Sequence, residues 1–287
     1  MVVRRGSRRV GSRIPPTTAW KIALADPTGF VASARVADDF FEEPRLAQVY
    51  DPLDPDRSDL EVYAAIVDEL GARSVLDIGC GTGTFACMLA RRGIDVVGVD
   101  PAQASLNVAR SKPGADRVRW IHGDANSLPR LAVDAAFMTA NVAQVLLTDE
   151  EWEATLRAVH AALRPGGRLV FETRDPKQRA WEGWTKDSTR GSTEIPGMGV
   201  VRHWNQLLHV QDELVTFRGT VVFERDGAVY ESESTLRFRS REEIEGSLAA
   251  TGFRLDEIRD APDRPGREFV FVASRPDSGQ ETTSLQQ

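Results

Sequence analysis

The sequence lacks the features that define several protein classes. It holds only two cysteines and four histidines in 287 residues, and no group of them has the spacing of a metal site. No apolar run approaches the roughly 18 residues that a helix needs to cross a bilayer. A disulfide between Cys80, which lies between two glycines, and Cys87 would distort the intervening turn. We therefore expect a cytoplasmic protein with reduced thiols, no metal and no membrane partner.

Charge is distributed unevenly along the chain. The formal net charge is -7, but the first thirteen residues carry five arginines and no acid, so the rest of the chain carries -12 (that is, -7 minus +5). A body this acidic repels phosphate backbones, and nucleic acid is therefore not expected as a substrate. The arginine-rich arm has no hydrophobic periodicity, which predicts disorder, with a nucleic-acid-binding tail as the alternative. No apolar segment follows the arginines, so the arm is not expected to be a signal peptide.

From residue 58 onwards, strand-like and helix-like segments alternate. Thr148 followed by Glu151 predicts a capping box at the start of one helix. The predicted helices lie at 58–70, 84–92, 101–110 and 149–163, and the predicted strands at 74–78, 95–100, 118–122, 133–139 and 168–172. Alternation at this spacing predicts an α/β fold with a mostly parallel sheet that helices cover on both faces.

The alternation stops after residue 175. Three strand-like runs then predict an antiparallel β meander: 200–210, 214–224 and 229–239. Asp226-Gly227 predicts a type I′ turn between the last two runs. A second capping box, Ser240 with Glu243, opens a helix that precedes two final strands at 254–258 and 268–272.

These patterns divide the chain into segments of different character. A helix is expected near 44–50 and a loop at 51–56, before the first long helix. The predicted organisation is a disordered arm (1–35), an α/β domain (36–175 and 236–275), an inserted β cover (176–235) and a disordered tail (276–287). Three short strands cannot bury both of their faces, so the cover must pack on the α/β domain or on a second subunit of a homo-oligomer.

The strongest functional signal is a strand that runs into a glycine-rich turn and a helix, Val75-Leu-Asp-Ile-Gly-Cys-Gly-Thr-Gly83. Glycines allow close approach of a ligand, and the helix N-terminus offers free N–H groups. The spacing is G-x-G-x-G, whereas nicotinamide enzymes use G-x-G-x-x-G. Asp77, two residues before the first glycine, suits a ligand with an ammonium group better than a diphosphate.

Two more acids end successive strands. Asp100 ends the second strand, where a carboxylate can accept hydrogen bonds from both ribose hydroxyls. Asp124 follows the third strand, where it can accept from an adenine amino group or simply cap its own loop. Because the carboxyl ends of parallel strands meet at one edge of a sheet, these acids are expected to share one ligand site.

Four motifs in this order resemble the class I S-adenosylmethionine-dependent methyltransferases: Val75–Gly83, Val99-Asp100, Gly123-Asp124-Ala125 and Leu163-Arg-Pro-Gly-Gly-Arg-Leu169. The resemblance covers residues 58–175 and implies a seven-stranded Rossmann-like sheet with an antiparallel last strand. It also implies the site residues. Asp77, Gly79, Gly81 and Gly83 would surround the methionyl part of S-adenosylmethionine, Asp100 would hold the ribose, and Asp124 with the Ala125 backbone would contact the adenine. Asn141, in the turn after the fourth strand, would lie near the methyl group.

The acceptor side is less defined. Asn141, Glu172 and Arg174 are the strand-end residues best placed to hold a methyl acceptor. His203 and His209, six residues apart on one strand, are expected on the same face, either as acceptor-side bases or as ordinary polar strand positions. Three tryptophans, Trp181, Trp184 and Trp204, could form an aromatic wall over the acceptor or could pack in the core or at an interface. By analogy alone, Tyr50 is assigned to an N-terminal lid.

The predicted function is transfer of a methyl group to the nitrogen or oxygen of a small molecule by in-line displacement. A non-catalytic S-adenosylmethionine-binding protein and a nicotinamide-dependent oxidoreductase are the alternatives. An RNA methyltransferase is disfavoured by the acidic body and by the absence of an RNA-binding module from the sequence. The sequence predicts neither the acceptor nor the oligomeric state.

Overall fold

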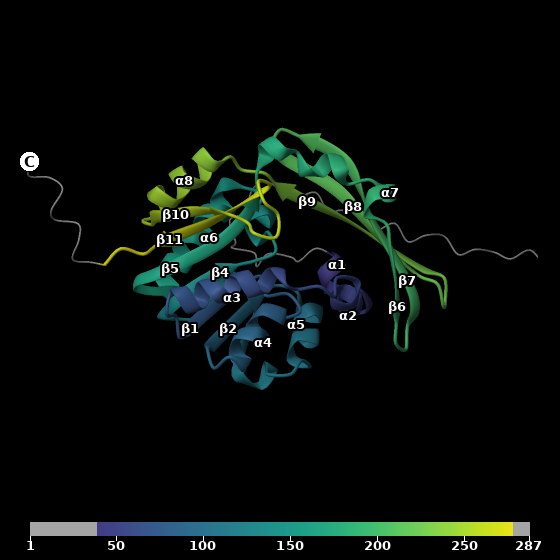
Figure 1. Cartoon of the computed structure of the whole chain (residues 1–287), viewed down its shortest axis with the longest axis horizontal. Helices are drawn as coiled ribbons and strands as arrows, with labels where there is room; N and C mark the ends of the chain where they lie inside the picture. The colour runs from purple at the N-terminus through teal and green to yellow at the C-terminus, as the bar shows by residue number, and fades with distance from the viewer. Residues whose placement is uncertain (1–38, 278–287) are drawn as a thin grey trace, which may run out of the picture. The chain divides into compact units, whose positions relative to one another are not determined.

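The computed structural model describes residues 39–277, so the expected arm at 1–35 and all but two residues of the expected tail at 276–287 lie outside the described residues. Within that part, seven strands form one sheet in the order β10-β11-β5-β4-β1-β2-β3 (Figure 1). The strands are β1 (Ser74–Ile78), β2 (Asp95–Asp100), β3 (Val118–His122), β4 (Val133–Met138), β5 (Leu163–Arg174), β10 (Arg254–Asp260) and β11 (Glu268–Ser274). Only β11 runs antiparallel to its neighbours in this sheet. The expected Rossmann-like sheet with one antiparallel strand is confirmed.

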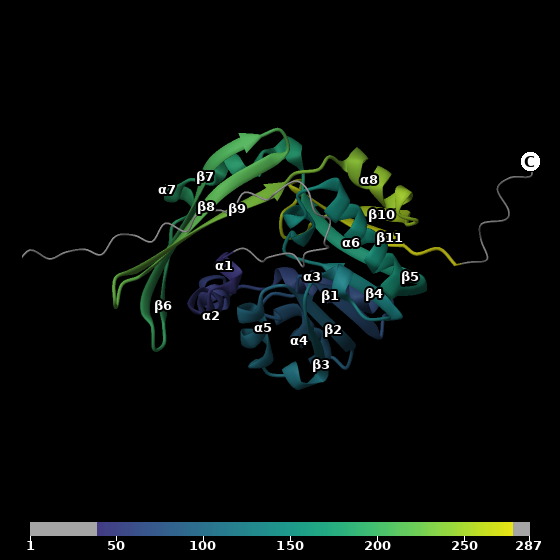
Figure 2. The same cartoon turned by 180° about the vertical axis from the view of Figure 1, so that it is seen from behind.

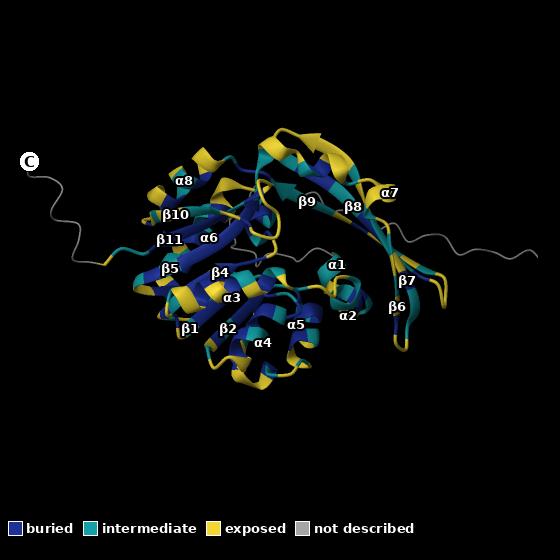
Figure 3. Ribbon diagram, in the orientation of Figure 1, coloured by how far each residue is buried: buried dark blue, intermediate teal, exposed yellow. Residues whose placement is uncertain are grey.

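Helices cover both faces of this sheet. On one face, α6 and α8 pack against alternate residues of β4, β5 and β11, and on the other face α3 and α4 pack against the intervening residues. The helices of the described part are α1 (Asp39–Glu42), α2 (Pro44–Leu53), α3 (Asp59–Glu69), α4 (Thr84–Arg91), α5 (Gln103–Arg110), α6 (Asp149–Ala162), α7 (Lys186–Thr189) and α8 (Arg241–Ala250). The strands between the two helical layers are buried, and exposed residues lie on the outer surfaces (Figure 3).

Both predicted capping boxes are present. The Thr148 hydroxyl accepts the Glu151 N–H at 3.1 Å, and the Glu151 carboxylate accepts the Thr148 N–H at 3.2 Å. Ser240 and Glu243 make the same reciprocal pair at the start of α8. Each pair satisfies two backbone groups that a helix start leaves free, and this explains why α6 and α8 begin where the sequence predicts.

The inserted sheet has a strand that the sequence analysis missed. In the described chain it contains four strands in the order β6-β7-β8-β9, namely β6 (Gly191–Ile195), β7 (Gly199–Gln211), β8 (Leu214–Phe223) and β9 (Ala228–Arg237). The expected antiparallel meander is confirmed by β7, β8 and β9, but the expectation of three strands is wrong because β6 adds a fourth. Only Ile195 of β6 is buried, so this edge strand carries no hydrophobic alternation to signal it.

Two local predictions are also wrong. A type I′ turn needs positive φ at both central residues, but only Gly227 has it (φ 72°), and the loop is closed by the Gly227 N–H on the Phe223 carbonyl at 2.9 Å. The loop expected at 51–56 begins as helix instead, because α2 continues to Leu53. Leu53 packs against a buried apolar cluster, which favours the extra turn despite Pro52.

A β-bulge changes which histidines share a face. Leu207 pairs with Phe217 but His209 pairs with Thr216, so one extra residue, Leu208, interrupts the register of β7. His203 pairs with Val221, which lies on the opposite face of β8 from Thr216. The expectation that His203 and His209 share a face is wrong, because a bulge reverses the alternation of the residues that follow it.

The inner face of the inserted sheet carries two apolar clusters. The first joins α2 to the sheet through Leu46, Val49, Ile195, Val201, Val221 and Phe223. The second joins the segment after β5 to the sheet through Trp181, Trp184, Val215, Phe217 and Phe238. Both views show α1 and α2 between α5 and the inserted sheet (Figures 1 and 2). We refer to residues 39–53, which form these two helices, as the N-terminal cover.

Candidate functional site

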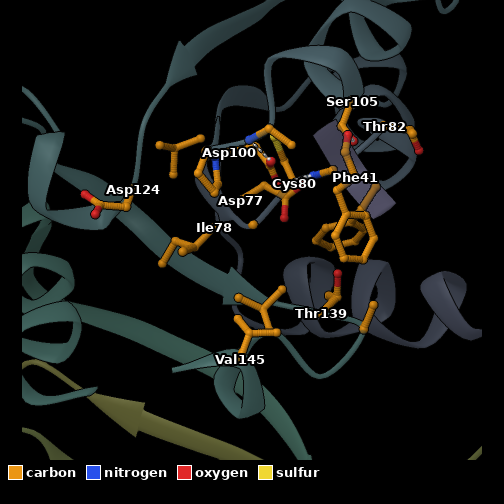
Figure 4. A pocket seen from close by; sticks show the side chains of 18 of the residues that line it. Phe41, Asp77, Ile78, Cys80, Thr82, Asp100, Ser105, Asp124, Thr139 and Val145 are labelled. Carbon is orange, nitrogen blue, oxygen red and sulfur yellow. Dashed lines mark hydrogen bonds between the residues drawn. The ribbon is translucent and has the colours of Figure 1, made fainter. Parts of the chain in front are cut away.

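A cavity lies at the carboxyl edge of the sheet, where β1, β2, β3 and β4 end. Its wall includes six of the residues expected to hold the cofactor: Asp77, Gly79, Gly81, Asp100, Asp124 and Ala125. Figure 4 shows Asp77 and Asp100 close together near its middle, with Asp124 toward one end and Phe41 and Thr139 on the other side. The topology therefore brings together residues that are up to 48 positions apart in the chain.

Asp77 is the most unusual group in this cavity. Its side chain is 1% exposed, and neither carboxylate oxygen has a hydrogen-bond partner. Burial, followed by the nearby charge of Asp100, raises the pKa of Asp77 to about 8. A buried carboxylate without partners is costly unless a ligand completes it. The residue at this position therefore fits a ligand that brings a cation with N–H donors.

Asp100 is held rigidly at the end of β2. One oxygen accepts the Gly81 N–H and the other accepts the Ala102 N–H, both at 2.8 Å. Burial raises the pKa of Asp100 above its ordinary value. Each oxygen keeps a second lone pair, so the carboxylate can still accept from a vicinal diol while it fixes the glycine turn.

Asp124 has a structural function that the sequence left open. Its Oδ1 accepts the N–H groups of Asn126 and Ser127, at 2.9 and 3.1 Å, and thereby caps a short 3₁₀ helix, η2 (Ala125–Ser127). The predicted loop-capping role is confirmed. The residue also lines the cavity, so an adenine contact through Oδ2 remains a prediction.

The three glycines of the turn differ in what they do. All have positive φ, but Gly79 and Gly81 line the cavity and Gly83 does not. A Cβ on Gly83 would lie 2.5 Å from the Trp120 ring, so this glycine permits close packing of α4 on β3. A Cβ on Gly81 would meet nothing within 4 Å. Gly81 is therefore the position where backbone and ligand approach each other without obstruction.

The N-terminal cover contributes part of the cavity wall. Phe41 and Tyr50 line it, and so does Arg57 at the start of α3. Phe41 and Tyr50 pack edge to face with a centroid distance of 5.8 Å. Tyr50 was assigned to this region by analogy, whereas Phe41 and Arg57 were missed, because no motif or periodicity marks them. Among the described residues that line the cavity, Arg57 is the one with a cationic side chain, and its guanidinium pairs with Asp59 at 3.3 Å.

The turn after β4 is strained. Ala140 and Asn141 both adopt left-handed conformations, with φ of 56° and 61°, which costs non-glycine residues energy. The Asn141 N–H donates to Glu172 Oε1 at 3.0 Å, and this bond holds the turn against the end of β5. Thr139, Ala140 and Val142 line the cavity, whereas Asn141 itself does not.

Glu172 and Arg174 belong to a buried charge network beside the cavity. Burial, followed by the charge of Glu268, raises the pKa of Glu172 to about 7. Arg174 pairs with Glu268 at 3.4 Å and donates to Gln144 at 2.9 Å. Neither Glu172 nor Arg174 lines the cavity, so their predicted contact with an acceptor needs an acceptor that extends beyond the cavity wall.

His203 lies apart from the cavity, on the inner face of the inserted sheet. Its ring occupies the space beside Gly191 of β6, and its buried Nδ1 has no hydrogen-bond partner. Burial lowers the pKa of His203, which favours the neutral ring. Of the two roles left open for Trp204, the aromatic wall is wrong, because this residue pairs with Thr220 on the outer face and lies under Lys186. Trp184 packs on the inner face, against Phe217.

The described residues also bear on metal binding, membrane spanning and disulfide formation. Among residues 39–277, no group of three or more His, Cys, Asp or Glu side chains could hold a metal ion, and no helix is long and apolar enough to span a bilayer. Cys80 and Cys87 are both buried and free. The polar groups that line the cavity are carboxylates, hydroxyls, backbone groups, the Cys80 thiol and the Arg57 guanidinium, and aromatic and aliphatic side chains form the rest of its wall.

Comparisons with known proteins identify the family of the chain. A family model described as a methyltransferase domain matches residues 75–167. The chain is 30% identical over 192 residues to demethylmenaquinone methyltransferase of Thermus thermophilus. The aligned region covers 65% of this chain and 77% of the relative. It is also 33% identical over 127 residues to an uncharacterized methyltransferase of Oceanobacillus iheyensis. This alignment covers 41% of this chain and 58% of the relative. The chain spans about half the length of several other curated relatives that it matches.

A solved structure shows the same fold over most of the chain. It is the S-adenosylmethionine-bound amino pentose methyltransferase CalS10 of Micromonospora echinaspora, with a TM-score of 0.60, 24% identity and coverage of 85% of this chain and 99% of that one. At this identity, the likeness establishes the fold alone. The family follows from the Thermus thermophilus relative, which is matched over more than three quarters of its length. The chain therefore belongs to the class I S-adenosylmethionine-dependent methyltransferases.

Proposed function

We propose that the protein transfers the methyl group of S-adenosylmethionine to a nitrogen or oxygen atom of a small, polar molecule. The observation that carries the proposal is the Asp77 carboxylate, which is 1% exposed and without partners in the cavity wall. A nicotinamide dinucleotide offers a diphosphate to this region, whose negative charge would oppose ionisation of Asp77 further instead of pairing with its carboxylate. An amino-acid ammonium satisfies both the charge and the hydrogen-bonding needs of the carboxylate.

The remaining cavity residues suit the other parts of the cofactor. Asp100 faces the ribose, Asp124 and the Ala125 backbone face the adenine, and Gly79 and Gly81 allow the methionyl chain to approach the turn. Arg57 is the cavity-lining cation that can pair with the cofactor carboxylate. We propose these roles together, because each polar part of the ligand then meets a protein group of opposite charge or of complementary hydrogen-bonding capacity.

We place the acceptor between the cavity and the inner face of the inserted sheet. The two apolar clusters of that face are separated by a row of uncharged polar residues, in which Asn205, Gly219 and Ser232 pair across β7, β8 and β9. Asn205 is exposed, and Phe40 of the N-terminal cover lies against Gly219. Amide and hydroxyl groups without a net charge favour a neutral acceptor that carries several hydrogen-bonding groups.

The proposed chemistry depends on positioning. The cofactor supplies an activated methyl group, and the protein must hold the acceptor lone pair within roughly 3–3.5 Å and in line with the breaking bond. The strained turn at Ala140 and Asn141, held by Glu172, forms the rigid wall beside the reacting atoms. Glu172 and Arg174 would contact the distal part of the acceptor.

A neutral amine needs no base before it attacks, whereas a hydroxyl gains about 10²- to 10⁴-fold from one. His203 is the candidate base, since burial keeps its ring neutral. No carboxylate is hydrogen-bonded to its Nδ1 in the described structure, so it lacks the orientation of a strongly activated base. We therefore favour an acceptor that needs little activation.

The remaining alternatives and partners stay predictions. A protein that binds S-adenosylmethionine without turnover would use the same cavity. The expected homo-oligomer would use the inserted sheet, which exposes three of its larger apolar side chains, Leu208, Val210 and Val229. The expected cytoplasmic location is likewise a prediction, as is the expected division of the chain into arm, α/β domain, cover and tail.

A labelling screen tests the proposal. The purified protein is incubated with methyl-labelled S-adenosylmethionine and fractionated pools of small metabolites, and labelled products are identified by mass spectrometry. The matched control is Asp77→Asn, which preserves the size of the side chain. Label that enters one product with the native protein and not with the variant supports the proposal. Tight binding of S-adenosylhomocysteine without any labelled product across the pools supports the non-catalytic alternative.

A further inference from the structure

A polar cluster connects the N-terminal cover to the glycine turn. Asp51 Oδ1 accepts hydrogen bonds from the hydroxyls of Thr82 and Thr84, at 2.7 and 3.2 Å. Asp51 Oδ2 pairs with Lys112 Nζ at 2.6 Å, and the same ammonium donates to the Thr84 hydroxyl at 2.7 Å. Four side chains from three segments, namely the end of α2, the glycine turn with the start of α4, and the loop after α5, thus meet in one network.

Two of the four residues in this network line the cavity, and the other two lie outside its wall. Thr82 lies inside the glycine turn and Thr84 begins α4, and both line the cavity. Asp51 directly follows Tyr50, which belongs to the N-terminal cover and also lines the cavity. Asp51 and Lys112 themselves do not line it. The network therefore connects the cover to the turn without standing in the ligand's place.

The cover is attached to its two neighbours in different ways. Its buried apolar side chains Leu46 and Val49 pack against the inserted sheet. Toward the α/β domain, the bonds described for the cover are polar: besides the Asp51 network, the Glu42 carboxylate accepts the Gln103 N–H at 2.8 Å and the Phe41 carbonyl accepts the Ser105 hydroxyl at 3.0 Å. Among the described residues, the two large apolar clusters of the α/β domain contain no residue of α1 or α2.

We infer that Asp51 is a positioning residue that latches the N-terminal cover onto the glycine turn and so holds Phe41 and Tyr50 over the bound cofactor. Apolar contacts are not directional, whereas hydrogen bonds fix the distance and orientation of the groups they join. These bonds join the cover, from which Tyr50 lines the cavity, to Thr82 and Thr84, which line it from the turn, so their loss would free one wall of the cavity from the other. The inference rests on the proposed function in that it takes the cavity as the cofactor site.

The first test measures binding of S-adenosylhomocysteine by calorimetry and its dissociation by stopped-flow displacement. Asp51→Ala removes the whole latch and is expected to raise the Kd about tenfold, through faster dissociation. Asp51→Asn keeps an oxygen for the two threonines and loses the ion pair, so a smaller increase of about threefold is expected. The matched control is Glu61→Ala, which removes an ion pair to Arg92 between α3 and α4 at residues that do not line the cavity. This control is expected to stay within twofold of the native protein.

A second variant tests whether a weaker Kd in Asp51→Ala arises from the broken latch or from a general loss of folding. Lys112→Met removes the cation from the network and leaves the cavity wall intact. If the latch is real, the Asp51→Ala and Lys112→Met effects on the Kd are less than additive in the double variant, because each breaks the same unit. Full additivity, or a Kd for Asp51→Ala within twofold of the native value, overturns the inference.

Hydrogen exchange gives an independent readout. With S-adenosylhomocysteine bound, backbone amides of residues 44–53 are expected to be protected in the native protein and to lose that protection in Asp51→Ala, while the amides of β1 and β4 remain protected. Weaker binding with unchanged protection of 44–53 assigns the loss to the charge alone and overturns the latch. Native protein that binds no S-adenosylhomocysteine contradicts the proposed cofactor site, an outcome distinct from failure of the latch.

Discussion

Replacing Asp77 by asparagine is expected to change both ligand binding and its linkage to pH. Burial, followed by the charge of Asp100, raises the pKa of Asp77 to about 8. At pH 7, a group with this pKa is about nine-tenths protonated. A ligand ammonium beside it requires the carboxylate, so binding of S-adenosylhomocysteine at pH 7 should release about 0.9 proton from this residue. The Asp77→Asn variant has no such proton to release.

The magnitude of the binding loss follows from two opposing terms. Removing one partner of a buried charge pair costs roughly 2–5 kcal/mol. At pH 7, the native protein must spend about 1.4 kcal/mol to ionise Asp77, which the variant does not. The net loss of about 0.6–3.6 kcal/mol predicts a Kd that is about 3- to 400-fold weaker in the variant, with the larger difference at pH 8.

Without ligand, Asp77→Asn should raise the free energy of unfolding, although it weakens ligand binding. The native state holds a proton on Asp77 that the unfolded chain, with an ordinary pKa of 3.8, releases. The free energy of unfolding therefore falls as the pH rises from about 4 to about 8, by up to about 6 kcal/mol if the buried site does not relax. Asp77→Asn removes this slope, so the variant should gain stability relative to the native protein between pH 5.5 and pH 8.

Calorimetry in phosphate and in Tris measures the proton release, because the two buffers differ in ionisation enthalpy. Urea unfolding at pH 5.5 and pH 8 measures the stability difference. Equal proton release by the native protein and the variant, together with an unchanged Kd, would refute the assignment of Asp77 to the ligand ammonium.

Four further outcomes are expected. S-adenosylhomocysteine at about one hundred times its Kd should stabilise the protein by about 2.7 kcal/mol, and stabilisation by NAD alone in the same thermal-shift assay contradicts the cofactor assignment. Asp100→Ala should weaken ligand binding in calorimetry by about 1.5–3 kcal/mol for each hydroxyl bond lost; an unchanged affinity rejects the ribose role. Gly83→Ala should lower the free energy of unfolding in urea by about 1–3 kcal/mol, because its Cβ meets the Trp120 ring, whereas a neutral substitution would show that the ring moves away freely. With the acceptor known, His203→Ala should slow single-turnover methyl transfer by less than about 100-fold, and a loss of about 10⁴-fold with both ligands bound would show an essential base.

The sequence predicts the parts of this structure that depend on local signals. The glycine turn, the two capping boxes and the alternation of buried strands are encoded within a few residues, and all of them lie where expected. The acids Asp77, Asp100 and Asp124 meet in one cavity because parallel strands end at one edge. Topology thus converts local patterns into a site.

The missed features depend on contacts between distant segments. Phe41 and Arg57 line the cavity only because the chain before β1 folds back over the sheet edge, and no short-range pattern predicts this. The edge strand β6 has polar, exposed residues and is stabilised by its pairing with β7. The bulge at Leu208 arises from the pairing with β8, so the sequence of β7 alone could not show that His209 changes face.

The shared apolar cluster of α2 and the inserted sheet has a consequence for synthesis and for protein engineering. Leu46 and Val49 leave the ribosome about 150 residues before Val201 and Val221, against which they pack. The first helices of the described chain must therefore wait for the insertion before they reach their final environment. A chimera that exchanges the insertion with that of a relative should exchange residues 39–53 with it, because the two segments bury one another and neither can be replaced alone without exposing the other.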